Sequence, residues 1–510
     1  MKTVAVVGAG IGGLSAAIVL AASGAHVDVF ERAPTPGGKM REALVAGRTL
    51  DVGPTVLTMR WALDQVFAAA GTTLDDHVRL TRASTLARHT WVDGTTLDLH
   101  ADRARSAEAI AALAGRREAD RYVEFCAHAK RIYDSVERPF LRSQRPTPMA
   151  VLRESASAGL GIFARIDAHR TMWRALATHF EDARLRQLFA RYATYSGSSP
   201  LEAPATLNLI AHVEQEGVFV VAGGMFRLVH ALVAIARSMG VMFRFNAEID
   251  EIVVERGRVA GVRLASGEDV RSDAVVLNAD VSALADGRFG SMAARGARGA
   301  TLVDRSSSAL TWAVVGAANG RALHRHNVFF SADYEREVRE LHEDRVLPRD
   351  PTVYVCAQDR DDESHDSPRE GDERFFIIVN APPLGDRALP SPSEIDACET
   401  RAFEGMERRG VSLQATSMVR TTPADFERLF PSTGGALYGR ATHGMGAALS
   451  RPSARASTQG LYLAGGSVHP GAGVPMASLS GQLAASALLE DFASTRTYPT
   501  VGTRGSISTP

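Results

Sequence analysis

The feature that most restricts the fold of this chain is a glycine-rich turn near its N-terminus, Gly8-Ala-Gly-Ile-Gly-Gly13. The turn follows an apolar run at residues 3–7 that predicts a β-strand, and it opens a small-residue helix at about residues 12–22. A second strand is expected at residues 27–31. This order is typical of a dinucleotide-binding βαβ unit, because bare glycines let a pyrophosphate approach the backbone at a helix start.

An acidic residue, Glu31, supports this interpretation because it ends the second predicted strand. A carboxylate at this place accepts hydrogen bonds from ribose hydroxyls and repels a 2′-phosphate, which disfavours NADP. A glycine turn of purely structural use remains the alternative at this point. The motif alone also does not separate NAD from FAD.

The stretch at residues 5–25 carries no formal charge, which is also typical of a signal peptide or membrane helix. Its five glycines and its change from strand to helix period favour the βαβ unit instead. Elsewhere no apolar run is long enough to span a bilayer, so membrane contact is expected to be peripheral. A net charge of -1, from 57 basic and 58 acidic residues, gives no field to attract nucleic acid.

Three widely spaced cysteines, Cys126, Cys356 and Cys398, show no spacing typical of zinc or of a disulfide framework. We therefore expect buried thiols, no metal site and a cytoplasmic location. Downstream, four strands are expected at 242–246, 248–255, 258–264 and 274–278 as a β-meander, and three at 310–315, 352–356 and 374–380 as a second sheet. A charged run at 359–366 between these last strands predicts a solvated hairpin loop rather than a metal site.

Two segments after the βαβ unit resemble those of flavin amine oxidases and phytoene desaturases. Gly37-Gly38-Lys39-Met40 is similar to the second glycine pair that approaches the FAD pyrophosphate and flavin edge in that superfamily. Asp51-Val-Gly-Pro-Thr55 is similar to the extended segment beside the isoalloxazine. Lys39 stands where arginine is usual, which keeps the charge but loses a bidentate contact. The resemblance implies non-covalent FAD rather than NAD.

The most informative segment is at residues 460–481, which predicts a strand at 461–464, a glycine loop at 465–473 and a helix from Pro475 to about Leu489. Its His469-Pro-Gly-Ala-Gly-Val-Pro475 resembles bacterial carotenoid (phytoene-type) desaturases. In such enzymes the helix start points at the flavin N1/O2 edge. A structural glycine loop is the alternative.

Further segments place the chain within that family. Residues 195–200 and 217–225 resemble its central loop and its Gly-Gly turn, and residues 203–208 and 474–480 are most similar to the 1-hydroxycarotenoid 3,4-desaturases of purple bacteria. The implied substrate is an acyclic carotenoid of spheroidene- or spirilloxanthin-type biosynthesis. The implied acceptor of electrons is oxygen or a quinone, and the implied location is the cytoplasmic side of the inner (photosynthetic) membrane.

The resemblance implies an α/β fold with a discontinuous Rossmann-type FAD-binding domain at residues 1–60, 217–285 and 455–492. A helical, membrane-facing region at 61–216, a β-sheet substrate domain at 286–454 and a disordered tail at 493–510 complete the expected organisation. The expected cofactor contacts are Gly8, Gly10, Gly12, Gly13, Glu31, Arg32, Gly37, Gly38, Lys39, Gly53, Pro54, Thr55, Ile249, Gly465, Gly466, Gly473, Val474, Pro475 and Met476.

Desaturation removes a hydride from one carbon and a proton from its neighbour, and flavin N5 is the natural hydride acceptor. The allylic cation left behind is delocalised, so a weak base suffices and no catalytic triad is expected. His469 and Tyr195 are candidates for that base, with packing roles as the alternative. The segment 139–176 mixes arginines with large apolar residues, which suits either a membrane-facing patch or an amphipathic helix packed on the core.

Four other functions stay open at this point. They are a phytoene or neurosporene desaturase, a carotenoid cis-trans isomerase, a flavin amine oxidase and a non-catalytic lipid-binding escort protein. A nicotinamide dehydrogenase is disfavoured, because the C-terminal flavin loop would then have no use.

Overall fold

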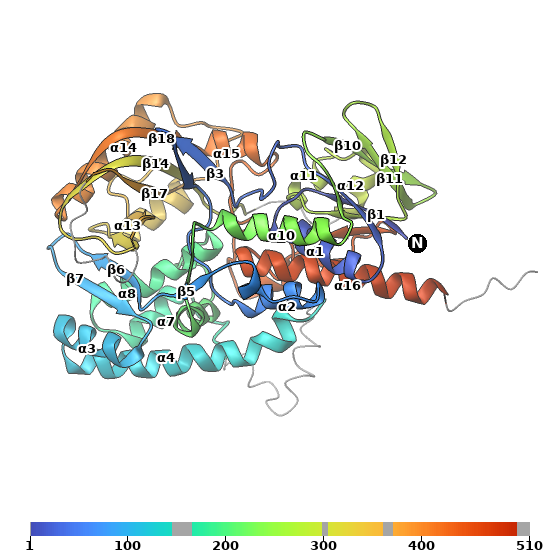
Figure 1. Ribbon diagram of the computed structural model, residues 1–510. Coiled ribbons are helices and arrows are strands. Elements are labelled where there is room, and N and C mark those ends of the chain that lie inside the picture. The colour runs from blue at the N-terminus through green and yellow to red at the C-terminus, as the bar shows by residue number, and fades with distance from the viewer. Residues whose placement is uncertain (1, 145–165, 298–303, 361–370, 497–510) are drawn as a thin grey trace, which may run out of the picture.

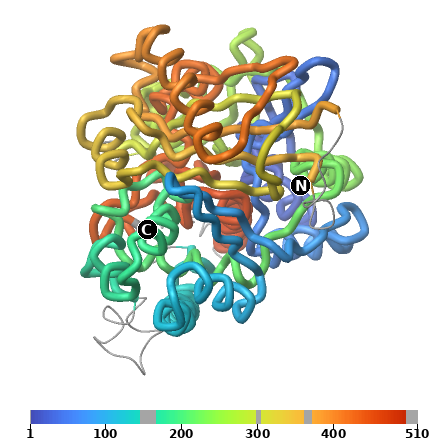
Figure 2. The backbone as a smooth tube through the Cα atoms, turned by 90° about the vertical axis from the view of Figure 1, so that its left-hand side faces the viewer, coloured from blue at the N-terminus to red at the C-terminus, as the bar shows by residue number. Residues whose placement is uncertain are grey.

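The computed structural model describes residues 2–144, 166–297, 304–360 and 371–496. Two main β-sheets lie at opposite ends of the molecule, and a layer of helices packs below the second sheet (Figures 1 and 2). The first sheet includes strands that are more than 450 residues apart in the chain, so its order is decided by tertiary pairing.

The first sheet has five strands, all parallel, in the order β19-β13-β1-β2-β9. Their bounds are β1 Thr3–Val7, β2 His26–Phe30, β9 Met242–Arg244, β13 Ala274–Leu277 and β19 Leu461–Leu463. Alternate residues of β1 enter different cores: Val4 and Val6 pack toward the helices, whereas Ala5 and Val7 face the opposite side. A parallel sheet covered on both faces explains these continuous apolar runs.

Three helices cover one face of this sheet: α1 (Ile11–Ala22), α10 (Phe226–Ser238) and α16 (Val474–Arg496). The other face carries a small antiparallel sheet of β10 (Ile249–Glu255), β11 (Arg258–Leu264) and β12 (Asp269–Arg271), with α11 (Val281–Ala285) and α12 (Ser291–Ala294). The prediction of one meander at 242–278 is therefore wrong in part. Strands β9 and β13 join the parallel sheet, because α10 carries the chain across to pair β9 with β2.

The second sheet has seven strands in the order β18-β14-β17-β16-β15-β6-β7. Their bounds are β6 Thr85–Thr90, β7 Thr96–His100, β14 Ser308–Gly320, β15 His326–Phe329, β16 Val353–Ala357, β17 Glu373–Ala381 and β18 Val411–Thr421. The three strands predicted at 310–315, 352–356 and 374–380 are confirmed as β14, β16 and β17. Strands β6 and β7 come from the region expected to be mainly helical, and they extend this sheet.

Helices cover both faces of the second sheet. Helix α14 (Pro392–Arg408) packs against Trp312, Phe375 and Ile377 on one face. The opposite face, which includes Tyr354 and Phe376, packs toward the helical layer. That layer consists of α3 Arg103–Ala114, α4 Arg116–Val136, α7 Met172–His179, α8 Ala183–Ala190 and α9 Leu209–Glu216.

Shorter elements complete the described fold. They are α2 Trp61–Ala69, α13 Tyr334–Arg339, α15 Pro423–Leu429, the hairpin of β3 Glu42–Val45 with β4 Arg48–Asp51, and the pair of β5 Leu80–Arg82 with β8 Phe219–Val221. Cys126, Cys356 and Cys398 are buried and unpaired, as predicted. Within the described ranges, no helix has both the length and the apolar composition needed to cross a bilayer.

The predicted C-terminal tail and the predicted charged loop each differ in part from the structure. Helix α16 continues to Arg496 rather than ending near Leu489, and its last turns are held by ion pairs from Arg455 to Glu490 and Asp491. Residues 493–496 of the expected tail are thus helical, whereas 497–510 lie outside the described residues. The charged run at 359–366 does join an antiparallel pair, β16 and β17.

The first two residues of that charged run are not solvated. Arg360 forms an ion pair with Glu373 at 2.7 Å, and both side chains are 4% exposed. Asp359 pairs with Arg374 and Arg48. Local charge density predicted a surface loop, but neighbouring strands supply partners for these two charges. Residues 361–366 lie outside the described residues.

Helices α1 and α16 cross in close contact on the helical face of the first sheet. A Cβ atom at Gly481 would lie 2.0 Å from the carbonyl oxygen of Gly12, and Ser15 and Ser478 share a hydrogen bond of 3.0 Å between their hydroxyls. Only glycine fits at this crossing. The contact brings the starts of both helices to the same edge of the parallel sheet.

We predict that Gly481→Ala destabilises the protein. Alanine gains about 1 kcal/mol of helix propensity over glycine, but the added methyl meets a backbone oxygen that no rotamer change can move away, and overpacking opposes folding by about 1–3 kcal/mol or more. The free energy of unfolding, measured in urea, should fall. Gly446→Ala is the control, because its Cβ would meet nothing within 4 Å and its φ is -98°. Equal stability of the two variants would contradict the packing argument.

Candidate cofactor and substrate site

The N-terminal glycine turn lies at the carboxyl edge of the parallel sheet, between β1 and α1. Gly8 has a φ of +99°, and a Cβ atom there would lie 2.8 Å from the carbonyl oxygen of Asn278. Helix α1 begins after Gly10 with no side-chain cap and no acidic residue in its first turn. The unpaired N–H groups and the positive end of the helix dipole are therefore available to an anion.

Glu31 lies directly beside this turn. Its carboxylate accepts hydrogen bonds from the backbone N–H groups of Ala9, at 2.8 Å, and Ala33, at 2.9 Å. These two bonds hold the side chain at the end of β2, and Glu31 lines the cavity described below. A carboxylate has about four acceptor positions, so two remain for hydroxyl donors such as those of a ribose.

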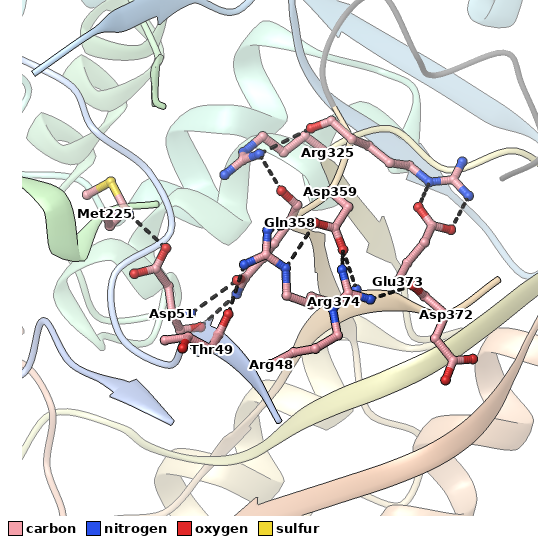
Figure 3. Close-up of polar contacts among 11 residues, drawn as sticks. Arg48, Thr49, Asp51, Met225, Arg325, Gln358, Asp359, Asp372, Glu373 and Arg374 are labelled. Atoms are coloured by element: carbon pink, nitrogen blue, oxygen red, sulfur yellow. Dashed lines mark hydrogen bonds and ion pairs between the residues drawn. The ribbon is translucent and has the colours of Figure 1, made fainter. Parts of the chain in front are cut away.

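The extended segment that follows is held by Asp51. Its carboxylate accepts a hydrogen bond of 2.7 Å from the N–H group of Met225 (Figure 3). It also accepts one of 3.0 Å from the N–H group of Phe226, the first residue of α10. Its backbone exchanges two hydrogen bonds with the side-chain amide of Gln358, of 3.1 and 2.7 Å. Burial raises the pKa of Asp51. Asp51 thus connects residues 51–55 to α10, which covers the first sheet, and to Gln358, which follows β16 of the second sheet.

A cluster of ion pairs surrounds this connection. Asp359 accepts from Arg374 at 2.6 Å and from Arg48 at 3.0 Å, and Arg374 also donates to the carbonyl oxygen of Thr49 (Figure 3). The β3–β4 hairpin is thereby fastened to β17 of the second sheet. Gly53, Pro54 and Thr55 consequently lie at the junction of the two sheets.

One continuous cavity of about 790 Å³ runs along this junction. It is lined by most of the predicted cofactor contacts: Gly8, Gly10, Gly12, Glu31, Arg32, Gly37, Gly38, Lys39, Gly53, Pro54, Thr55, Ile249, Gly466, Gly473, Val474, Pro475 and Met476. The structure therefore brings together the N-terminal and C-terminal glycine segments, which are more than 400 residues apart in the chain.

Two predicted glycines do not line the cavity. A Cβ atom at Gly13 would lie 2.1 Å from the carbonyl oxygen of Gly8, so this glycine permits close packing of α1 on the turn. The N–H group of Gly465 donates to the hydroxyl of Ser480 at 3.2 Å. Both glycines pack behind the residues that line the cavity.

Two cations, the half-buried Lys39 and the buried Arg451, face the cavity where the glycine segments meet. The Nζ of Lys39 donates to the carbonyl oxygen of Leu437 at 2.6 Å, and Arg451 donates to the carbonyl oxygens of Arg440 and Gly466. Burial lowers the pKa of Lys39 and lowers the pKa of Arg451 to about 10. Asp280 lines the cavity near both cations but forms no ion pair with either in the described part of the chain. One carboxylate balances only one of the two positive charges, so a bound anion would neutralise the other.

His469 does not line the cavity. It is buried, its ring packs edge-on against Phe140 with 4.8 Å between ring centres, and burial lowers its pKa to about 4. Neither ring nitrogen forms a well-aligned hydrogen bond in the described structure, although backbone groups of Phe140 and Ser143 lie close to the ring. This surrounding favours the packing role over the role of a base.

Tyr195 does line the cavity, but its hydroxyl already has a hydrogen-bond partner. It donates to the carboxylate of Glu214, which also accepts from Tyr192 at 2.6 Å. Burial raises the pKa of Glu214 and raises that of Tyr195 well above its ordinary value. Tyr195 is therefore held as a neutral phenol and is a poor acceptor for a proton.

Away from the glycine segments the cavity becomes largely apolar. Its walls come from the helical layer and from the face of the second sheet, through Leu207, Ile210, Val213, Ala309, Phe376 and Ile378. Tyr354 and Arg191 also line this end, with the guanidinium 5.5 Å from the centre of the tyrosine ring. Sequence reasoning missed Tyr354, Arg191 and Arg451, because which face of a strand or loop meets a cavity depends on tertiary packing.

The segment expected to face a membrane is described only at its ends. Residues 145–165, with Arg145, Arg153, Leu160, Ile162, Phe163 and Arg165, lie outside the described residues. On either side of that range Phe140, Leu141, Ile166 and Ala168 line the apolar end of the cavity. Arg142 packs over the ring of Trp61 at 4.2 Å.

Comparison with known proteins agrees with this geometry. Residues 11–489 match the model of the family described as flavin containing amine oxidoreductase. The chain is 48% identical to the hydroxyneurosporene desaturase of Rubrivivax gelatinosus, over 99% of this chain and 97% of that protein. It is 42% identical to the protein of the same name from Cereibacter sphaeroides, with 96% and 98% covered. An oxidoreductase from Methanosarcina mazei shares the fold, with a TM-score of 0.62 at 14% identity over 96% of this chain and all of that one.

We predict that Lys39→Met weakens the binding of FAD without destabilising the protein that lacks it. The buried ammonium is penalised by desolvation until an anion neutralises it, and the loss of one charged hydrogen bond corresponds to about a tenfold to hundredfold change in affinity. The dissociation constant is measured by flavin fluorescence, and stability by thermal unfolding of the flavin-free protein.

The exposed lysine of α4 provides the control. Lys130 pairs with Asp134 on the surface, so Lys130→Met should leave the FAD affinity unchanged. If Lys39→Met binds FAD as tightly as the unmodified protein, Lys39 does not neutralise the cofactor.

Proposed function

The chain belongs to the family of flavin-containing amine oxidoreductases, and from that premise we propose that it is an FAD-dependent carotenoid desaturase that introduces the 3,4 double bond into an acyclic 1-hydroxy or 1-methoxy carotenoid. The observation that carries the proposal is the single cavity that runs from a dinucleotide turn into an apolar chamber. The near full-length identity to hydroxyneurosporene desaturases supports the class of substrate.

The residues of the cavity fit FAD. In this proposal the start of α1 and Lys39 hold the pyrophosphate, Glu31 accepts hydrogen bonds from the adenosine ribose, and the start of α16 at Val474 faces the flavin. Residues 53–55 lie against the ring system, because Asp51 fixes them at the junction of the sheets. No cysteine follows Cys398 in the sequence, in keeping with a non-covalent cofactor.

The reaction removes a hydride and a proton from adjacent carbons of the substrate. Bound FAD supplies the hydride acceptor. The chain's own residues orient the polyene along the apolar wall and exclude water from the carbocation that forms. Conjugation spreads the positive charge, so a weak acceptor takes the neighbouring proton. Since Tyr195 is engaged by Glu214 and His469 lies outside the cavity, neither is proposed as that acceptor.

An amine oxidase is the structural alternative within the same family, and Arg191 argues against it. A guanidinium at the apolar end of the cavity repels the ammonium group of an amine substrate, whereas a neutral polyene is unaffected. A cis-trans isomerase and an escort protein place the same demands on the cavity as a desaturase. An isomerase differs from a desaturase in the mass of its product, and an escort protein forms no product and does not reduce the flavin.

We predict that the FAD-loaded protein converts 1-hydroxyneurosporene to a product lighter by two hydrogens, with absorption shifted to longer wavelength. Anaerobic addition of substrate should bleach the yellow flavin. An unchanged product mass identifies an isomerase, and a flavin that never bleaches identifies an escort protein. Conversion of phytoene but not of 1-hydroxyneurosporene would contradict the assignment of a hydroxycarotenoid substrate.

The finer parts of the proposal concern electrons and location. Electrons pass from the reduced cofactor to oxygen or a quinone, and the protein associates peripherally with the cytoplasmic side of the inner (photosynthetic) membrane. The apolar lining on both sides of residues 145–165 supports access for a carotenoid from the bilayer at this point.

We predict that the purified protein cosediments with vesicles of phosphatidylethanolamine and phosphatidylglycerol. Because the net charge is -1, binding should come from apolar contact and persist at high salt. Deletion of residues 145–165 should reduce the sedimented fraction, with FAD content as the control for folding. Equal sedimentation of both proteins would contradict this location of the membrane contact.

A further inference from the structure

We infer that a chain of three hydrogen-bonded side chains, Thr55, Tyr354 and His326, recognises the hydroxyl group at C1 of the substrate. In this inference Thr55 and Tyr354 contact that hydroxyl, and His326 is a positioning residue behind them. The inference rests on the proposed function and names the residues that select a hydroxylated carotenoid over an otherwise identical one that lacks the hydroxyl.

The three side chains come from separate parts of the fold. The hydroxyls of Thr55 and Tyr354 are 2.7 Å apart, and the Tyr354 hydroxyl is also 2.7 Å from Nδ1 of His326. Tyr354 is 8% exposed and His326 is 4% exposed. Thr55 and Tyr354 line the cavity, whereas His326 does not.

The apolar surroundings make this polar chain distinctive. Tyr354 on β16 pairs with Ile378 on β17, and the ring of Phe376 belongs to the same face. The guanidinium of Arg191 packs over the Tyr354 ring at 5.5 Å and restrains it from the side of the helical layer. A polar group on such a wall is costly to leave without a hydrogen-bond partner.

The hydrogen bonds between Thr55, Tyr354 and His326 leave the Thr55 hydroxyl able to form a further hydrogen bond, whichever way the donors point. Burial lowers the pKa of His326 to about 3, so the imidazole is neutral. If its Nδ1 is an acceptor, Tyr354 donates to it and Thr55 donates to Tyr354, which leaves acceptor positions on the threonine oxygen. If Nδ1 carries the proton, every donor points the other way, and the Thr55 hydroxyl is left as a donor.

A substrate hydroxyl fits the open position in both cases, because a hydroxyl group donates one hydrogen bond and accepts two. A hydrocarbon end group would instead leave a buried polar group without a partner, which is the strongest basis for discrimination against an analogue that lacks the hydroxyl.

The position of Thr55 agrees with the chemistry of a 3,4-desaturation. Two carbon–carbon bonds separate C1 from C3, so the C1 oxygen lies within roughly 4 Å of the reacting carbon at ordinary bond lengths. The group that binds this oxygen must therefore lie beside the flavin. Thr55 ends the segment that Asp51 fixes at the junction of the sheets, where we propose that the flavin lies.

A role for the same chain as the proton acceptor is less favoured. The terminal imidazole is buried, and its low pKa means that the imidazolium is strongly disfavoured there. The chain therefore offers hydrogen bonds but little basicity. Loss of a proton acceptor would slow the reaction of every substrate, whereas loss of hydroxyl recognition would slow only that of the hydroxylated one.

The test compares kcat/KM in the FAD-loaded enzyme for 1-hydroxyneurosporene and for 1,2-dihydroneurosporene, in which a hydrogen atom replaces the C1 hydroxyl. Tyr354→Phe and Thr55→Val are expected to lower the ratio of these two values by about tenfold to a hundredfold, mainly through the hydroxylated substrate. His326→Leu should lower the same ratio, and His326→Gln should restore part of it. Tyr438→Phe is the matched control, because Tyr438 lines the same cavity and its hydroxyl has no part in the chain.

FAD content and thermal unfolding of each variant separate recognition from loss of fold or cofactor. A ratio unchanged in both Tyr354→Phe and Thr55→Val overturns the inference, and so does an equal fall for both substrates, which indicates a proton acceptor or a general support. If the unmodified enzyme itself does not prefer the hydroxylated substrate, the proposed function fails and the inference fails with it. A preference that the variants retain overturns the inference alone.

Discussion

The close crossing of α1 and α16 is the contact on which the site depends. At Gly12 and Gly481 the two helices approach until a single added methyl group would meet a backbone oxygen at 2.0 Å. This proximity sets the starts of both helices side by side at the carboxyl edge of the parallel sheet. Helix starts attract anions, and here two segments more than 450 residues apart line one cavity. A larger residue at either position would move one helix start away from the other.

A second constraint joins this edge to the rest of the molecule. Asp51 binds the start of α10 through its carboxylate and binds Gln358 of the second sheet through its backbone (Figure 3). Without these contacts the extended segment before Thr55 would have no fixed position between the sheets. The cavity exists because the two sheets hold this segment between them, with one wall of glycine backbone and another of apolar side chains.

The charges of the site are arranged along the cavity. The half-buried Lys39 and the buried Arg451 lie at the glycine end, where their hydrogen bonds go to backbone carbonyl oxygens. The apolar end carries Arg191 and the neutral chain through Tyr354. This arrangement suits an anionic cofactor at the glycine end, and the apolar side chains around Arg191 suit a neutral, mostly apolar substrate at the other end. It also explains why neither His469 nor Tyr195 behaves as an obvious base, since one is packed outside the cavity and the other is engaged by Glu214.

The sequence by itself determined the βαβ unit, the glycine segments and Glu31, because backbone conformation, periodicity and local spacing are properties of neighbouring residues. It also identified three strands of the second sheet and the carotenoid desaturase family. The tertiary structure alone decided that β9 and β13 join one parallel sheet, that Arg360 is buried against Glu373 and that His469 lies outside the cavity. It also decided which face of β16 presents Tyr354 to the cavity. These outcomes depend on contacts between residues distant in the chain, and a linear pattern contains no information on which distant residues meet.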